Sequence, residues 1–423
     1  MDNIAPPVTE LEAEAQLLAA GWPEEPLRVL EDHVDVLLLW CVQHRATDVT
    51  LQTGRPAMIE VDGVLYPITK RSLDSADMAN ILMKIYGPDA LAKLASGTDL
   101  DLSYEVRPER LTRYRFRVNI TAILSYGRDS VQVTMRSLPS MPPSMRDMGI
   151  EEAIIESWSP RQGLILITGP TGSGKTTLLA SGCRHLIERE QGCGKMLTYE
   201  APIEYVYDQI VGPRSLVAQS EVPRHIPSFA AGVRNALRRK PNIILVGEAR
   251  DRETMSAAIE AGQTGHLVFS TVHTVGVAAT VRRIISVFEP AERTERAYAL
   301  METLRMIVTQ ALVPRVGGGR IGLREYLVFD DNIREQLLDM PIDKWTVETQ
   351  RFLVRYGKTM EQSANEAFKA GVIDRRAYLM LTKGLTVSEK DYVEAAQKDK
   401  QKVAATFNLT KGLEEFDDDT TMI

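Results

Sequence analysis

One segment, residues 169–177, constrains this chain more than any other. It reads GPTGSGKTT, follows the apolar run LILIT and precedes the helical pattern LLASGCRHLIERE. This is the G-x-x-x-x-G-K-[ST] motif in the strand, loop and helix setting that it requires. Glycines let backbone N–H groups curl around phosphates, and the helix N-terminus favours negative charge. The predicted phosphate-binding residues are Gly169, Pro170, Thr171, Gly172, Ser173, Gly174, Lys175, Thr176 and Thr177.

Two of these side chains have specific expected roles. Lys175 is expected to reach the β- and γ-phosphates, and Thr176 to offer its hydroxyl to Mg²⁺. The alternative is a chance Gly-rich turn, which a chain of this length contains in roughly one case in a hundred. Because the flanking strand and helix are also in place, we predict nucleotide binding, with ATP and Mg²⁺ as the cofactors.

Two further segments place carboxylates after apolar strands. Residues 242–248 read NIILVGE, so Glu248 follows a strand, where a carboxylate holds Mg²⁺ or orients water. Taken alone, such a glutamate is more often a solvated surface residue. Residues 198–205 read TYEAPIEY, which puts Glu200 and Glu204 just past another strand as candidate bases for the attacking water.

The segment TGHLVFSTVHT carries two of only six histidines, His266 and His273, one at each end of a short predicted strand. Seven residues of strand separate them by roughly 20 Å, which disfavours a shared metal site. A lone histidine is usually structural, but beside a γ-phosphate it can sense the nucleotide by hydrogen bonding.

Composition and charge exclude several classes of protein. Apolar residues make up 44% and charged residues 25% of the 423 residues, which is ordinary for globular proteins. The longest apolar run, residues 34–42, is far shorter than the roughly 20 residues of a membrane-spanning helix, and no secretory leader is expected. Three cysteines (Cys41, Cys183 and Cys193) are too few for a disulfide framework. The net charge of -7 disfavours a chain-wide nucleic-acid footprint.

Changes of pattern divide the chain. Nine acidic residues and one basic residue lie within residues 1–35. Alternating runs around a helical stretch at residues 75–94 indicate a small α+β domain, and short apolar runs alternating with helices after residue 150 indicate an α/β domain with a mostly parallel sheet. Helices are expected at 333–338 and 347–370. The expected segments are an acidic arm (1–35), the α+β domain (36–136), a proline-rich linker (137–150), the α/β domain (151–330), a helical region (331–385) and a helical, acidic tail (386–423).

Four motifs in this order resemble those of one family. GPTGSGKTT, TYEAPIEY, NIILVGEARD and TGHLVFSTVHT look like the Walker A, Asp, Walker B and His boxes of the secretion ATPases of type II secretion, type IV pili and type IV secretion. TDVTLQTGRPAMIEVDG and RYRFRVNI are similar to the PAS-like domain of pilus-retraction ATPases, and GGGRIGLREYLV to their C-terminal helical region. The resemblance covers residues 40–385. It implies a RecA-like P-loop ATPase domain preceded by a PAS-like α+β domain and followed by a helical C-terminal region.

Two positions depart from the common pattern of that family. Ala201 stands where Asp is usual, and Asn242 where Asp is common. Both departures are similar to the type IVB (Dot/Icm) secretion ATPases and the conjugation ATPases of IncI-type plasmids. The retraction-type signature survives only in part, as NIREQLLD, which weakens a pilus-retraction assignment.

The resemblance also implies roles for single residues. Glu204 matches the catalytic glutamate, and Glu248 matches the Walker B glutamate, which would hold Mg²⁺ with Thr176, partly through water. His266 and His273 match the His box. The arginine-bearing strands that supply arginine fingers are matched by Arg115, Arg117 and Arg128, with Arg113 as a further candidate. A solvated strand face is the alternative for Arg113, Arg115 and Arg117, which alternate along one face.

The implied assembly is a homohexamer in which each nucleotide is clamped between an N-terminal domain and a RecA-like domain. Its partners would be inner-membrane secretion or conjugation machinery, with a second cytoplasmic ATPase as one candidate, and its location cytoplasmic, peripheral to the inner membrane through those partners. No direct nucleic acid contact and no integral membrane segment are expected. Three rivals stay open: a DNA-translocating RecA-like motor, a nucleotide-binding module without turnover, and a pilus retraction or assembly ATPase.

Overall fold

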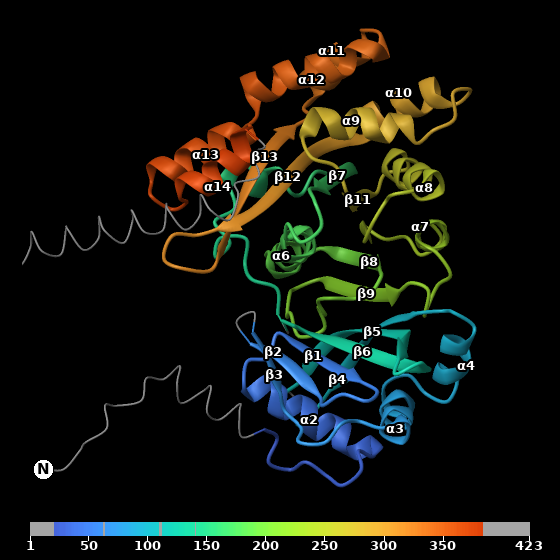
Figure 1. The fold of residues 1–423 in the computed structure, drawn as a ribbon. Helices are drawn as coiled ribbons and strands as arrows, with labels where there is room; N and C mark the ends of the chain where they lie inside the picture. The colour runs from blue at the N-terminus through green and yellow to red at the C-terminus, as the bar shows by residue number, and fades with distance from the viewer. Residues whose placement is uncertain (1–20, 62–63, 110–111, 140, 384–423) are drawn as a thin grey trace, which may run out of the picture. The chain divides into compact units, whose positions relative to one another are not determined.

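The computed structural model describes residues 21–383, except 62–63, 110–111 and 140 (Figure 1). The chain divides into two compact units. Unit 1 comprises the residues up to 164 together with 176–271, and unit 2 comprises 165–175 together with the residues from 272 onward.

Unit 1 begins with a six-stranded antiparallel sheet in the order β3-β2-β1-β6-β5-β4. Helices α2 and α3 cover one face of it (Figure 1). Apolar side chains at helical spacing on α2, such as Val34 and Leu38, share a core with alternate strand residues such as Val49 and Phe116. The elements are β1 (Asp48–Gln52), β2 (Met58–Val61), β3 (Val64–Pro67), β4 (Leu100–Val106), β5 (Tyr114–Ser125), β6 (Arg128–Leu138), α2 (Glu31–Gln43), α3 (Ser75–Ile85) and α4 (Ala90–Ala95).

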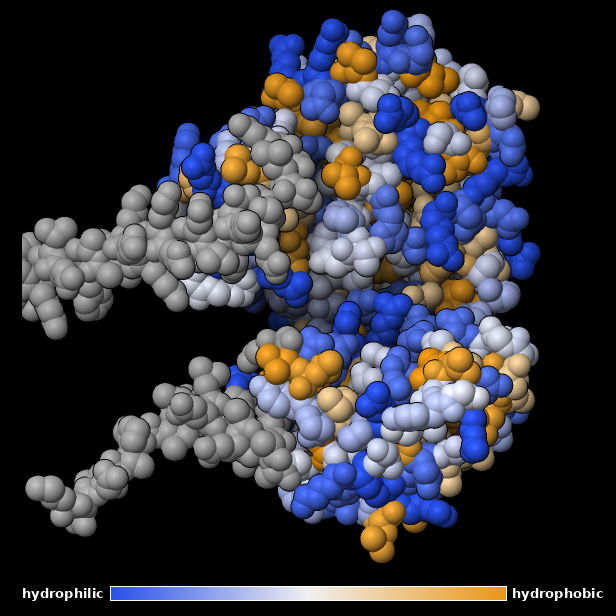
Figure 2. Space-filling model, viewed as in Figure 1, coloured by the Kyte–Doolittle hydropathy of each residue, from blue (hydrophilic) through white to orange (hydrophobic). Residues whose placement is uncertain are grey.

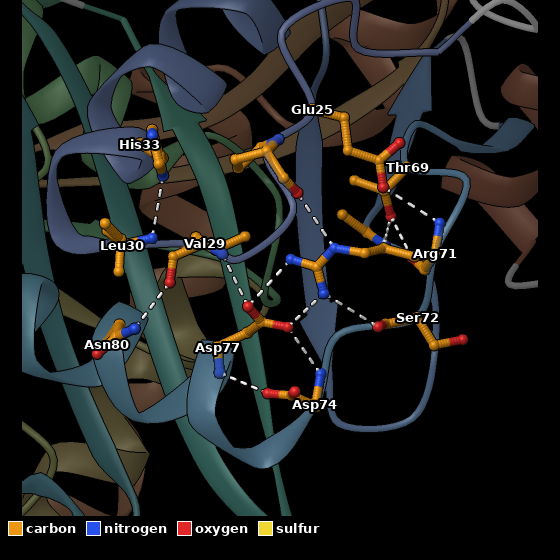
Figure 3. A network of polar contacts seen from close by, with 12 residues as sticks. Glu25, Val29, Leu30, His33, Thr69, Arg71, Ser72, Asp74, Asp77 and Asn80 are labelled. Carbon is orange, nitrogen blue, oxygen red and sulfur yellow. Dashed lines mark hydrogen bonds and ion pairs between the residues drawn. The ribbon is translucent and has the colours of Figure 1, made fainter.

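A polar network fastens the segment that precedes α2 to this domain (Figure 3). The buried Asp77 carboxylate accepts hydrogen bonds from Arg71 Nη1 at 2.5 Å and Nη2 at 3.0 Å, and from the Val29 N–H at 2.8 Å. Burial raises the pKa of Asp77, but the hydrogen bonds from Arg71 and the backbone outweigh burial and hold it below its ordinary value. Trp22 and Val29 lie in the domain core, so the boundary expected at residue 35 falls inside α2.

The rest of unit 1 contains four parallel strands in the order β11-β10-β8-β9. Strand β10 is buried along its whole length, as expected for a parallel strand covered on both faces. Because these strands run in the same direction, their carboxyl ends meet at one edge. The elements are α5 (Glu152–Glu156), α6 (Lys175–Glu188), β8 (Gly194–Glu200), β9 (Ser215–Glu221), α7 (Phe229–Ala236), β10 (Ile243–Val246), α8 (Arg252–Gln263) and β11 (Leu267–Val272).

Unit 2 contains most of β7, the long antiparallel hairpin β12–β13 and the helices of the C-terminal region. The strand order here is β13-β12-β7. A small apolar cluster joins the hairpin to α13 and α14. The elements are β7 (Gly163–Thr168), α9 (Val277–Ser286), α10 (Arg293–Thr303), β12 (Leu304–Pro314), β13 (Arg320–Val328), α11 (Asp331–Leu338), α12 (Ile342–Tyr356), α13 (Met360–Lys369) and α14 (Arg375–Lys383).

Three predicted segments differ from the structure. GGGRIGLREYLV forms a turn and β13, a strand, and is not part of the helical region. The helix expected at 347–370 is two helices, because Gly357 and Lys358 leave the helical path and Lys358 pairs with Tyr326 of β13. The helix expected at 75–94 is likewise two helices, with Gly87 and Pro88 between them. The dipeptide Asp62–Gly63 is typical of a hairpin turn. It lies outside the described residues, although β2 and β3 on either side pair as a hairpin would.

Within the described residues, no helix is long and apolar enough to cross a membrane. On the face that Figure 2 shows, apolar side chains are interspersed with polar and charged ones.

Candidate functional site

The predicted phosphate-binding loop has the backbone that its glycines permit. It lies between the end of β7 and Lys175, the first residue of α6. Gly169, Gly172 and Gly174 have φ angles of 140°, 76° and 80°, a region that residues with a Cβ rarely adopt. A Cβ on Gly169 would lie 2.3 Å from the carbonyl oxygen of Gln310, so only glycine fits there.

Side chains of β12, the strand next to β7 in the sheet, contact this loop and the end of its strand. Gln310 Nε2 donates a hydrogen bond to the Ser173 carbonyl at 2.8 Å, and the hydroxyls of Thr168 and Thr309 are 2.7 Å apart. Ser173 Oγ is buried and has no hydrogen-bond partner among the described residues. An orphaned buried hydroxyl within a glycine-rich turn fits a phosphate oxygen.

Lys175 is buried at the start of α6. Its ammonium donates to the carbonyls of Gly169 and Pro170, both at 2.9 Å. His273 Nδ1 lies 3.5 Å from Lys175 Nζ, so the histidine at the carboxyl end of β11 is brought to the phosphate-binding loop. The arrangement gathers one cation and one titratable ring at the place where phosphates are expected.

In unit 1, the loop after β8 brings Glu204 to the start of α6. The Thr176 hydroxyl lies close enough to the Glu204 carboxylate to lower its pKa, and the Tyr205 hydroxyl lies 3.2 Å from Thr177 Oγ1. Burial raises the pKa of Glu204 above its ordinary value, while Arg117 and the Thr176 hydroxyl act in the opposite direction. A glutamate with a raised pKa, next to the residue that follows Lys175, has the chemistry of a general base.

Three of the predicted arginines reach the same loop, each in a different way. Arg113 Nη1 donates to Asp208 Oδ2 at 2.7 Å. Arg115 is only 4% exposed and donates to the backbone carbonyls of Ile203 and Glu204, both at 2.7 Å. Arg117 is 43% exposed, and its Nη1 lies 3.7 Å from Glu204 Oε1. The sequence placed these arginines on one face, and the structure adds that Arg115 is committed to backbone carbonyls.

The other predicted residues lie in separate places. Glu248 follows the end of β10, on the edge where β8 ends in Glu200. His266 precedes β11, at the opposite edge, and its Nδ1 lies 3.1 Å from the Ala261 carbonyl. Arg128 is exposed at the far end of the β5–β6 hairpin, eight residues along β5 from Arg117, or roughly 26 Å. Among the described contacts, neither His266 nor Arg128 meets Glu204, so their roles stay predictions.

Comparison with known proteins decides the family. The family model described as "Type II/IV secretion system protein" matches residues 27–373. The chain belongs to this family. It is therefore a P-loop ATPase of the secretion group, and the resemblance inferred from its motifs is confirmed, as is the order of a PAS-like domain, a RecA-like domain and a helical region.

Several relatives of this secretion ATPase have known structures or names. It is 46% identical to the ATPase DotB of Legionella pneumophila over 86% of this chain and 98% of that one, with a TM-score of 0.81. A crystal structure of the pilus retraction motor PilT with bound ADP is 31% identical, with a TM-score of 0.73 over 85% of this chain and 99% of that one. The type IV pilus retraction ATPase PilT of Pseudomonas aeruginosa is 35% identical over 70% of this chain and 83% of its own length.

The residues of the secretion ATPase fit a nucleotide with a loosely held divalent cation. No group of three or more His, Cys, Asp or Glu side chains among the described residues is placed to bind a metal. Mg²⁺ typically takes one or two protein ligands and keeps water and phosphate oxygens as the others. Thr176 and Glu248 are compatible with such a site.

Sequence reasoning missed two side chains of β9 that contact the Glu204 loop, which is residues 201–208. Gln219 bonds to the backbone of Tyr205 and Tyr207, and Glu221 to the backbone of Ile203. The segment SLVAQSE, with polar residues two apart, is the one signal that was present.

Proposed function

We propose that this secretion ATPase works as a homohexameric motor that hydrolyses ATP to power a type IVB secretion or conjugation system. The observation that carries the proposal is its 46% identity to Legionella pneumophila DotB along 98% of that chain. Ala201 and Asn242, which depart from the common family pattern, support the same branch.

The residues have distinct proposed roles in hydrolysis. Lys175 binds the β- and γ-phosphates, and the loop backbone from Gly169 to Gly174 surrounds them. Thr176 and Glu248 would hold Mg²⁺, which neutralises charge on the phosphates when bound. Glu204 accepts a proton from the attacking water, a task for which its raised pKa is suited. His273, 3.5 Å from Lys175, reports the state of the nucleotide to the end of β11.

The arginines divide into two proposed groups. Arg117 is partly exposed beside Glu204, so we assign it to the developing charge on the transferred phosphoryl group. Arg115 holds the backbone that carries Glu204. Arg128 and His266 keep their family roles as proposals.

Movement of the N-terminal domain about the linker is the proposed output. ATP can drive closure only by contacting the closed state better than the open one, and an N-terminal arginine is a contact of that kind. Strand β6 ends at Leu138, near the start of the linker. Arg184 of α6 donates a hydrogen bond to the Pro142 carbonyl at 2.8 Å, so the linker is anchored to α6 within unit 1.

ATP turnover and assembly test the proposal together. Mg²⁺-dependent hydrolysis is measured for the wild type, Lys175→Ala and Glu204→Gln, each with light scattering after size exclusion. We expect the wild type to hydrolyse ATP as a hexamer. We expect Glu204→Gln to assemble as a hexamer as well, but to hydrolyse ATP at least about 100-fold more slowly. A wild type that hydrolyses ATP only as a monomer would contradict the motor.

Pilus retraction is the second candidate, because PilT of Pseudomonas aeruginosa is 35% identical to this chain. Complementation separates the two. We expect the gene to restore secretion in a Dot/Icm strain that lacks its own ATPase, and not twitching in a strain that lacks PilT. The reverse pattern would assign the chain to pilus retraction.

A further inference from the structure

Three side chains, two from β9 and one from β5, hold the backbone of the Glu204 loop. From β9, Gln219 Nε2 donates to the Tyr205 carbonyl at 2.9 Å, and Gln219 Oε1 accepts the Tyr207 N–H at 3.0 Å. The Gln219 amide thus bonds to the loop as the peptide group of a neighbouring strand would. It fixes the first and third residues after Glu204, on its carboxyl side.

Glu221 fixes the loop on the amino side of Glu204. Its Oε2 accepts the Ile203 N–H at 3.2 Å and the hydroxyl of Ser103 on β4 at 3.0 Å. Glu221 is 3% exposed, so this carboxylate is buried where its hydrogen bonds are strong. Ser103 pairs with Arg117 across β4 and β5, so the same carboxylate links the Glu204 loop to the N-terminal sheet.

Arg115 supplies the third contact. Its guanidinium spans the carbonyls of Ile203 and Glu204 at 2.7 Å each. Together with the two β9 side chains, it satisfies backbone groups on both sides of Glu204. The Glu204 carboxylate itself is left to Thr176 and Arg117. The backbone of the loop is fixed, and the reactive group stays beside the start of α6 and Arg117.

We propose that Gln219 and Glu221 are positioning residues for ATP hydrolysis, which hold the Glu204 backbone so that its carboxylate reaches the attacking water. The inference rests on the proposed role of Glu204 as the base. Misplacing a catalytic group by about 1 Å costs roughly 100-fold in rate. Loss of either side chain therefore lowers kcat without removing a group that binds nucleotide.

Steady-state kinetics test this proposal. Gln219→Ala and Glu221→Ala are expected to lower kcat roughly 10- to 100-fold, with the Kd for a fluorescent ATP analogue within about twofold of the wild type. Glu221→Gln keeps an oxygen for the Ile203 N–H and is expected to retain most of the wild-type kcat. Ser220→Ala, on the other face of β9, is the matched control and is expected to leave kcat unchanged.

A second background separates positioning from general structural damage. Adding Gln219→Ala to Glu204→Gln should cause no further loss of single-turnover rate, because the group that Gln219 positions is already gone. An equal loss in both backgrounds, or an unchanged kcat in Gln219→Ala and Glu221→Ala, would overturn the proposal. If Glu204→Gln hydrolyses ATP as fast as the wild type, the proposed role of Glu204 is overturned instead.

Discussion

At the scale of single residues, Glu200 is a buried carboxyl that is separate from the catalytic candidate four residues later. Thr198 Oγ1 donates to its Oε1 at 2.5 Å and Gln219 Nε2 at 3.0 Å. Burial raises the pKa of Glu200 from 4.5 to about 7, an effect that these hydrogen bonds offset only in part. The folded protein therefore holds a proton at this site across a pH range in which the unfolded chain has lost it.

The pH dependence of stability follows from this difference. Between pH 4.5 and about 7 the folded state binds more protons at Glu200, so the free energy of unfolding falls as pH rises. The loss is complete above pH 7 and amounts to roughly 3 kcal/mol. The side chain that Glu200→Gln introduces cannot ionise. We therefore expect the free energy of unfolding of Glu200→Gln, minus that of the wild type, to be roughly 3 kcal/mol larger at pH 8 than at pH 5.

Urea unfolding of both proteins at the two pH values measures the effect. The exposed Glu156→Gln serves as the control, and its difference from the wild type should be the same at pH 5 and pH 8. An equal difference at both pH values for Glu200→Gln would contradict a raised pKa at this site.

The sequence predicted the motif residues of the site and not the side chains that hold them. Lys175, Thr176 and Glu204 stand in motifs whose chemistry is local. Gln310 bonds to a residue 137 positions away, and Glu221 to one 118 positions away. Pairings over such distances depend on the tertiary fold, and a single sequence carries no record of them.

At the scale of elements, the packing of α6 depends on one glycine. A Cβ on Gly182 would lie 2.1 Å from the ring of Trp158, which is fully buried and stacked on Phe269. In a helix interior, Gly→Ala normally adds about 1 kcal/mol of stability. Here we expect Gly182→Ala to cost about 1 to 3 kcal/mol, because a well-packed core does not accept the extra methyl group.

Denaturant unfolding, followed by tryptophan fluorescence, tests this packing. Glu188→Ala on the exposed face of the same helix is the control and should change stability by no more than about 0.5 kcal/mol. A stabilised Gly182→Ala would mean that Trp158 moves aside at little cost.

Helices and strands were predictable where the hydrophobic pattern agreed with the residues that begin and end such elements. The apolar runs of β8, β10 and β11 were predicted as strands, whereas β9, which reads SLVAQSE, was not. The break near Gly357 was missed because the helical spacing continues through it, although Thr359 and Gln362 form a capping box at the start of α13. A Cβ on Gly357 would lie 2.3 Å from the Tyr326 carbonyl, so the break follows from contact with β13.

At the scale of the whole molecule, charge bears on the choice between a secretion motor and a DNA motor. The net charge is -7, and the stretch RNALRRK at residues 234–240 is locally basic, with four basic residues and no acidic one. Its Arg234 and Arg238 are exposed. Binding to DNA that depends on phosphate contacts weakens steeply with salt, so it leaves a clear signature in the ATPase rate.

We therefore expect nucleic acid to leave ATP turnover unchanged. Single-stranded or duplex DNA, added at 50 to 200 mM salt, should alter the rate by less than about twofold, because an acidic chain gains little from counterion release. The double substitution of Arg234→Glu with Arg238→Glu should turn over ATP at the wild-type rate, with or without DNA. The opposite result would be an ATPase rate that DNA stimulates strongly at low salt, less as salt rises, and not at all in this variant. That result would identify a DNA motor that contacts DNA through residues 234–240, and would contradict the proposed secretion function.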